Sequence, residues 1–319
     1  MKPHNRFLLV TAQLLRSGNY ATKLCVLFKW FLMSYDADTR TGNAPPQTNA
    51  SMEVHIMNKK DFTTVQLAQG EMHIYDFGGV TLHAYQTGDP LADEVFLVEK
   101  AGTFVAIESP CFISSVAALN EYLYGRNVAG VLAAYHGAGA SFLPDAPKYA
   151  TANAAEYARS GGGKALIDQF SAVFVGDFDS SIHPITHTLS EGEAIIGGIR
   201  FVIHQTAEAF DVEIPEINAV YTHMLGHDCH SIVAGSGHAD AMIAQLQGYI
   251  KAGYDLILTS HYTPEDLKDA EAKIRYLEQL KTIASSCADG DAFKSAVRKR
   301  FPAYSGENYL DMTTGFFFS

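Results

Sequence analysis

The sequence is poor in cysteine, and its few cysteines are far apart. It has four in 319 residues, namely Cys25, Cys111, Cys229 and Cys287. No two of them form a C-x-x-C pair, so the sequence indicates neither a zinc ribbon nor a disulfide framework. This scarcity fits a reducing compartment, and we expect a cytoplasmic protein.

Positive charge is also scarce. Lysine and arginine together number 23 against 35 aspartates and glutamates, which gives a formal net charge of −12. Nucleic acids and anionic membrane surfaces are polyanions, so an acidic chain is a poor partner for either. We therefore expect a small-molecule substrate or ligand and no nucleic acid.

Long apolar runs are missing as well. The two runs near the N-terminus, Phe7–Leu15 and Leu24–Met33, both fall short of the ~20 apolar residues that a membrane-spanning helix needs. The polar stretch TGNAPPQTNAS (41–51) marks a boundary. We interpret residues 1–51 as an extension, disordered or loosely docked, and residues 52–319 as the domain. Two alternatives stay open. One is export, because the first apolar run has the length of a signal-peptide core. The other is that Met52 is the true first residue.

The first part of the domain has the pattern of strands followed by a helix and a buried strand. Short segments rich in Val, Phe and Thr predict consecutive antiparallel strands at 79–88, 94–100 and 103–109. Ala101 and Gly102 suit a tight hairpin between the last two. Apolar residues at helical spacing predict a helix over 113–125, and the apolar run 128–135 predicts a strand covered on both faces.

The second part repeats this pattern. We predict strands at 198–206, 217–223 and 254–261 and a helix at 238–253. A last helix is predicted with Thr263 as its cap, Pro264 in the first helical position and Asp266 completing a capping box. Predicted strands end at or next to His136, His223 and His261. In open α/β sheets, ligands bind beyond the carboxyl ends of strands, so these histidines lie where chemistry tends to occur.

Four segments, taken in order, resemble the metallo-β-lactamase superfamily. EVFLVEKAGTFVAIESP (94–110) is similar to the family's paired strands that end in Asp-x-Gly. VAGVLAAYHGAGASFLPDAPKYATANA (128–154) is similar to the strand and metal loop H-x-H-x-D-H. FDVEIPEINAVYTH (210–223) and YDLILTSHYTPEDL (254–267) resemble the later hairpin and the last ligand strand. The resemblance, over about residues 75–285, implies an α+β fold, an αββα four-layer sandwich with helices outside two mixed sheets.

The resemblance implies a family-type metal loop from which most ligands are missing. If His136 matches the first family histidine, the next ligand positions hold Ala138, Ala140 and Ser141. Asp-x-Gly becomes Glu108-Ser109-Pro110. The family's mid-chain histidine falls near Gln205 or Thr206, and its bridging aspartate falls near Thr222 or His223. Since alanine cannot coordinate a metal, the family's two-zinc centre is not expected here.

A rebuilt site is the alternative that the remaining histidines suggest. The stretch THMLGHDCHS (222–231) contains His223, His227 and His230 together with Asp228. If it is helical, the three histidines share one face, a spacing that can chelate zinc, nickel or iron. We predict at most one Zn or Fe ion, held by His136, His223 and His261, with His227 as a further ligand and Asp228 as an assisting catalytic residue. Gly226 could instead break the helix and scatter these side chains.

Two classes of function follow from the sequence. The first is a metal-dependent hydrolase acting on an ester, thioester, amide or phosphoester, with histidine or aspartate moving protons. The second is a metal-free pseudoenzyme that serves as a binding or regulatory module. Cys111 is a further candidate nucleophile, but it has no assignable base and is more typical of a buried structural cysteine. The aromatic tail NYLDMTTGFFFS (308–319) would dock on the body or on a partner, which leaves a homo-oligomer open.

Overall fold

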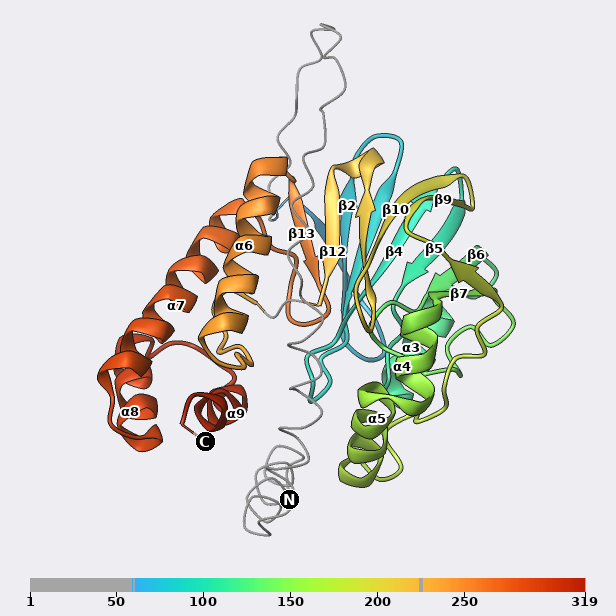
Figure 1. Cartoon of the computed structure of the whole chain (residues 1–319). Coiled ribbons are helices and arrows are strands. Elements are labelled where there is room, and N and C mark those ends of the chain that lie inside the picture. The colour runs from blue at the N-terminus through green and yellow to red at the C-terminus, as the bar shows by residue number, and fades with distance from the viewer. Residues whose placement is uncertain (1–58, 60, 224–225, 319) are drawn as a thin grey trace, which may run out of the picture.

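The structure is a computed structural model that describes residues 59, 61–223 and 226–318. The extension expected over residues 1–51 lies outside the described residues. Two sheets lie side by side in the centre, with helices on both outer sides (Figure 1). This confirms the predicted αββα sandwich.

The larger sheet has eight strands, and its strands follow each other in chain order. They are β1 (Thr63–Gln66), β2 (Glu71–Asp76), β3 (Thr81–Gln86), β4 (Glu94–Lys100), β5 (Thr103–Ile107), β6 (Asn127–Leu132), β7 (Lys148–Thr151) and β8 (His187–Leu189). Pairs from β1 to β5 are antiparallel, and pairs from β5 to β8 are parallel. The hairpin between β4 and β5 turns at Ala101 and Gly102, both with positive φ (49° and 77°), as the sequence predicted.

The smaller sheet has five strands in the order β13-β12-β11-β10-β9. They are β9 (Gly192–Ile196), β10 (Ile199–Gln205), β11 (Phe210–Ile214), β12 (Ala219–Thr222) and β13 (Leu256–Thr259), with a short 3-10 turn at Pro215–Ile217 before β12. All neighbours are antiparallel except β12 and β13, which run parallel with Thr222 opposite Thr259. The carboxyl ends of these two strands therefore meet at one edge of the sheet.

Seven helices lie outside the sheets in the described part of the chain. On the side of the larger sheet are α3 (Ile113–Tyr122), α4 (Ala152–Ser160) and α5 (Gly162–Val173), and on the side of the smaller sheet are α6 (Ser236–Ala252), α7 (Leu267–Ser286), α8 (Gly290–Arg300) and α9 (Glu307–Phe317). The tail docks on the body, because the ring of Phe317 stacks on Phe293 of α8 at a centroid distance of 5.6 Å.

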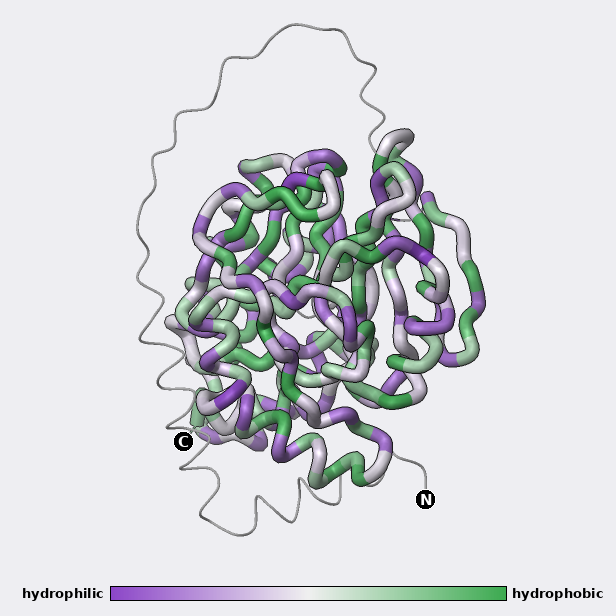
Figure 2. Tube along the Cα trace, turned by 90° about the vertical axis from the view of Figure 1, so that its right-hand side faces the viewer, coloured by the Kyte–Doolittle hydropathy of each residue, from purple (hydrophilic) through white to green (hydrophobic). Residues whose placement is uncertain are grey.

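The main core lies between the two sheets. Phe96 and Leu132 of the larger sheet face Phe201, Phe210 and Tyr221 of the smaller one, and all are fully buried. Hydrophobic and hydrophilic residues alternate over short stretches of the chain (Figure 2), as strands and helices with one buried face require. Among the described residues, none of the helices has the length and apolarity to cross a membrane.

The start of α7 differs from its prediction. The helix begins at Leu267, so Thr263 does not cap it and Pro264 is not its first residue. The reason is that the N–H and the carbonyl of Glu265 both bond to the backbone of Ile257 at 2.8 Å, which keeps the chain extended along β13. Asp266 is the cap, and with Asp269 it forms the capping box three residues later.

Candidate metal centre

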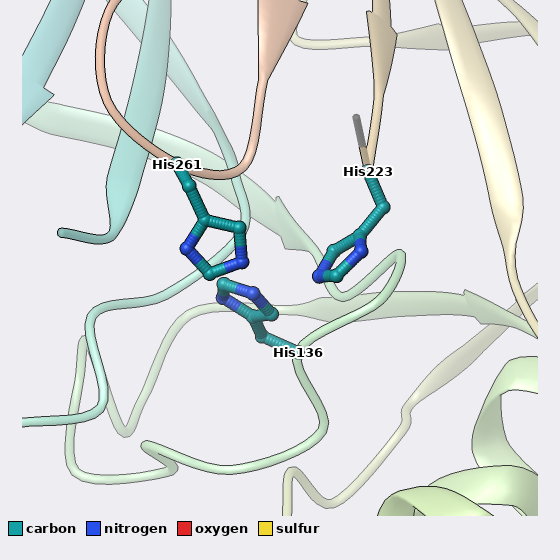
Figure 3. Close-up of side chains that lie close together, drawn as sticks. All are labelled: His136, His223 and His261. Carbon is teal, nitrogen blue, oxygen red and sulfur yellow. The ribbon is translucent and has the colours of Figure 1, made fainter. Parts of the chain in front are cut away.

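The structure brings together the three strand-terminal histidines. His136 follows β6, His223 directly follows β12 and His261 follows β13. One ligand atom from each ring lies within 4.8 Å of the others. Figure 3 shows the three rings pointing toward one another from three separate chain segments.

Glu108 holds the backbone that carries His136. Its side chain is fully buried, its Oε2 accepts a hydrogen bond from the His136 N–H at 2.9 Å, and its Oε1 accepts one from the Tyr135 N–H at 2.7 Å. The Tyr221 hydroxyl donates a third bond to Oε1, also at 2.7 Å. Sequence reasoning treated Glu108 only as a departure from the family pattern. It missed that a carboxylate here fixes the loop after β6.

The loop beyond His136 is packed rather than lined with ligands. Ala138 is 2% exposed and lies in an apolar cluster with Phe112, Phe174 and Phe178. Lys148, itself buried, donates from Nζ to two loop carbonyls, those of Phe142 at 2.8 Å and Leu143 at 2.7 Å. The place where the family pattern has a second histidine is therefore filled by hydrophobic packing.

His261 has one ring nitrogen engaged and one free to face the centre. Its Nδ1 lies 3.1 Å from the carbonyl oxygen of Leu91 and 3.2 Å from Oδ1 of Asp93. The Leu91 carbonyl can only accept, so the proton of this hydrogen bond belongs on Nδ1 and the lone pair on Nε2. In this tautomer Nε2 is able to bind a metal ion.

His223 is oriented by Tyr135. The two rings stack with centroids 4.9 Å apart, and the Tyr135 hydroxyl donates to Oδ1 of Asp211 at 2.5 Å. Desolvation lowers the pKa of His223 below its ordinary value, and the neighbouring rings of His261 and His136 lower it further. A lowered pKa favours the neutral ring, which is the form that binds a metal ion.

Carboxylates surround His136. Burial acts to lower the pKa of His136, but the charges of Glu108, Asp93 and Asp89 outweigh it and raise the pKa above its ordinary value. Burial, together with the charge of Asp93, raises the pKa of Asp89 to about 7. No lysine or arginine of the described chain forms an ion pair with any of these three carboxylates. A bound cation would stabilise the charged form of these carboxylates.

A second group of ligand-type atoms adjoins the first. Atoms of Asp93, Cys111 and His136 also lie within 4.8 Å of one another. Burial raises the pKa of the Cys111 thiol well above its ordinary value, and the nearby carboxylates raise it further. A thiol held in its protonated form is a poor nucleophile, which agrees with the structural interpretation of Cys111.

The structure does not bring His227, His230 or Asp228 into the histidine group. Residues 226–234 are not helical, so the expected shared helical face does not form. The His230 N–H bonds to the carbonyl of Ser305 at 2.9 Å, which draws this segment toward the C-terminal helices instead. The ring of His227 faces acidic side chains of the α7 start, with Nδ1 3.4 Å from both Oε1 of Glu265 and Oδ1 of Asp269. Asp228 is exposed in a turn.

Comparisons with known proteins bear on the fold. A scan against protein-family models gives no match, and a search of the curated proteins gives none. Among solved structures, the stereoselective inverting sec-alkylsulfatase Pisa1 from Pseudomonas sp. matches with a TM-score of 0.52 and 12% identity, over 75% of this chain and 49% of that chain. A double mutant of the same sulfatase matches with a TM-score of 0.55 and 10% identity, over 84% of this chain and 59% of that chain. The chain has the metallo-β-lactamase fold.

Metallo-β-lactamases themselves are also similar. One from Erythrobacter litoralis matches with a TM-score of 0.47 and 13% identity, over 68% of this chain and all of that chain. The present chain spans about half to three fifths of the length of the two alkylsulfatase chains. In the metallo-β-lactamase fold described here, the histidine group lies at the edge where strands of both sheets end.

The residues present fit one metal ion. Tetrahedral zinc with Zn–N bonds of about 2.0–2.1 Å places its nitrogens about 3.4 Å apart, so small ring rotations bring three imidazoles within 4.8 Å into range. Nδ1 of His136 and both carboxylate oxygens of Asp93 are buried without a hydrogen-bond partner among the described residues, as polar atoms around a cation site often are. A metal ion held by three histidines would keep a fourth position open, as catalytic zinc sites do.

Proposed function

We propose that this protein is a hydrolase of the metallo-β-lactamase fold with a single metal ion held by His136, His223 and His261. The observation that carries the proposal is the approach of three imidazoles, from the ends of three strands, to within 4.8 Å of one another. Imidazole ligands suit zinc and iron, so one Zn²⁺ or Fe ion is the proposed cofactor.

The chemistry of the site divides between the ion and the chain. When bound, the ion supplies a Lewis acid that polarises an acyl or phosphoryl oxygen and lowers the pKa of water. The chain holds the three rings in place: Glu108 fixes the backbone of His136, and Tyr135 stacks on His223. His227 and Asp228 are outside the proposed ligand set, because His227 faces Glu265 and Asp269 and Asp228 lies in an exposed turn.

The substrate class is a small ester, thioester, amide or phosphoester. Alkyl sulfates join this set because two structural neighbours are described as sec-alkylsulfatases. A panel of chromogenic acyl, phosphoryl and sulfuryl esters, assayed with the metal-loaded full chain, would show which bond is cleaved.

Metal content is the direct test of the proposal. The full chain, purified without chelators, should contain one Zn or Fe ion by elemental analysis. His223→Ala and His261→Ala should each lose it, while His187→Ala should retain it. His187 is a matched control, because it is exposed on β8 and stacks on Tyr149 in the larger sheet.

Two results would contradict this account. Two tightly bound ions per chain would show that the family's full centre has been rebuilt from other residues. No ion in the purified chain, and no binding on addition of zinc, would support the metal-free binding module instead.

A further inference from the structure

The chain before β4 and the chain after β13 are joined at the site. The Glu94 N–H bonds to the Ser260 carbonyl at 2.8 Å, and the Tyr262 N–H bonds to the Ala92 carbonyl at 2.8 Å. Between these bonds, Asp93 and His261 lie opposite each other as an isolated antiparallel bridge. Two segments about 170 residues apart in the sequence thus hold one carboxylate against one histidine.

The Asp93 side chain faces two of the three histidines. Its Oδ1 lies 3.2 Å from Nδ1 of His261, and a carboxylate oxygen lies within 4.8 Å of a ring nitrogen of His136. The side chain is 1% exposed, so it reaches these rings and not solvent. The Asp93 backbone is fixed as well, since its carbonyl accepts from the N–H and the hydroxyl of Thr87 at 3.2 and 2.8 Å.

We propose that Asp93 is a positioning residue that orients the rings of His261 and His136, keeps the proton of His261 on Nδ1, and thereby raises the affinity of the site for its metal ion. This inference rests on the proposed function. A carboxylate that accepts from the outer nitrogen of a histidine makes the inner nitrogen a better ligand, and such partners affect metal affinity by about 10–100-fold.

The alternative role for Asp93 is that of a direct ligand, shared with Cys111 and His136. The Cys111 sulfur instead contacts the Ser109 carbonyl at 3.8 Å and lies in an apolar cluster with Phe112 and Phe178. Direct ligation also requires Oδ1 of Asp93 to give up its contact with His261. The observed contact therefore favours an effect through the histidines.

The test compares Asp93→Asn with Glu94→Gln. Glu94 is the matched control because it is the next residue, is fully buried, and bonds Gln86 rather than a histidine. Zinc affinity of the full chain is measured at one fixed pH by competition with a chromogenic chelator. We expect Asp93→Asn to bind zinc about 10–100-fold more weakly and Glu94→Gln to bind it as the wild type does. Far-ultraviolet circular dichroism checks that both variants fold.

A second readout does not need the metal. In the metal-free chain with isotope-labelled histidine, long-range nitrogen–proton NMR spectra report the tautomer of His261. Because the Leu91 carbonyl also accepts from Nδ1 at 3.1 Å, we expect a proton on Nδ1 in the wild type and a larger share of the Nε2 tautomer, not a complete switch, in Asp93→Asn. A loss of stability alone would not change this tautomer ratio, so the signal distinguishes positioning from a merely structural role.

The outcomes separate this inference from the proposed function. If the wild type binds one zinc ion and Asp93→Asn binds it equally well, the role of Asp93 is refuted and the metal site stands. If the wild type binds two ions and both Asp93→Asn and Cys111→Ser reduce the number to one, Asp93 is a ligand and the inference is also refuted. If the wild type binds no metal, the proposed function fails, and an unchanged His261 tautomer in Asp93→Asn would refute the positioning role as well.

Discussion

Replacing Glu108 by glutamine tests how the loop after β6 is held. Three donors converge on this carboxylate: the N–H groups of Tyr135 and His136, and the hydroxyl of Tyr221. The two N–H groups bond to different oxygens. Whichever way the amide of Glu108→Gln is turned, its NH₂ group must therefore face one backbone N–H.

The size of the effect comes from two costs and one gain in the free energy of unfolding. One hydrogen bond to a charged acceptor is lost, which costs about 1.5–3 kcal/mol, and a buried N–H is left without an acceptor, which costs about 1–3 kcal/mol more. Burial raises the pKa of Glu108, so the neutral amide recovers part of the cost of burying a carboxylate. We expect a net loss of about 1–3 kcal/mol, or roughly 2–6 °C in melting temperature for a chain of this size.

The assay is urea unfolding at pH 7, followed by circular dichroism, together with zinc affinity of the folded protein. Tyr221→Phe is the comparison, because it removes the hydroxyl donor and leaves both N–H bonds to Glu108 intact. Tyr221→Phe should lower the zinc affinity less than Glu108→Gln does, since the backbone of His136 stays fixed. A Glu108→Gln protein that is as stable as the wild type and binds zinc equally well would refute this explanation of the loop.

Three further predictions concern other parts of the structure. Tyr135→Ala removes the stack on His223 and should weaken zinc binding by about tenfold, whereas Tyr135→Phe keeps the ring and should bind zinc as the wild type does. Equal zinc affinities of the two variants would show that the stack does not orient His223. Burial and the charge of Glu265 raise the pKa of Glu94 well above its ordinary value, although the hydrogen bond from Gln86 opposes this rise. Protonated Glu94 therefore stabilises the fold below about pH 4.3, and this contribution is lost as the pH rises through the raised pKa. Glu94→Gln should therefore gain stability relative to the wild type from pH 5 upward in urea titrations, and a constant difference would contradict the shift. Ala138→His restores a family ligand type at a packed position, so it should cost about 1–3 kcal/mol and leave the metal count at one; a second bound ion would show that the pocket can open.

Much of the fold was predictable because its strands and helices have regular patterns. The apolar run 128–135 predicted a buried strand, the helical spacing over 113–125 predicted α3, and Ala101-Gly102 predicted the hairpin. The start of α7 was not predictable from local signals. Thr263 and Pro264 have the sequence pattern of a helix start, but the pairing of Glu265 with Ile257 overrides it, and such a contact depends on tertiary structure.

The candidate site was predictable where its residues end strands. His136, His223 and His261 follow from strand ends that meet at one edge, whereas the grouping of His223 with His227 and His230 assumed a helix that does not form. Asp93 gave no signal, because an acidic residue before an apolar strand is common and its partner His261 is far away in the chain. Glu108 differed from the family pattern, and only the structure shows that its carboxylate accepts from the loop backbone.

The coordination of zinc in the loaded protein distinguishes the proposed site of three histidines from any other ligand set. X-ray absorption spectra at the zinc edge, recorded on the full chain with one equivalent of zinc, report the type and number of ligands. The account predicts three imidazole nitrogens at about 2.0–2.1 Å with a light-atom ligand in the remaining position. Sulfur at about 2.3 Å, which would place Cys111 on the metal, or fewer than three imidazoles would contradict it.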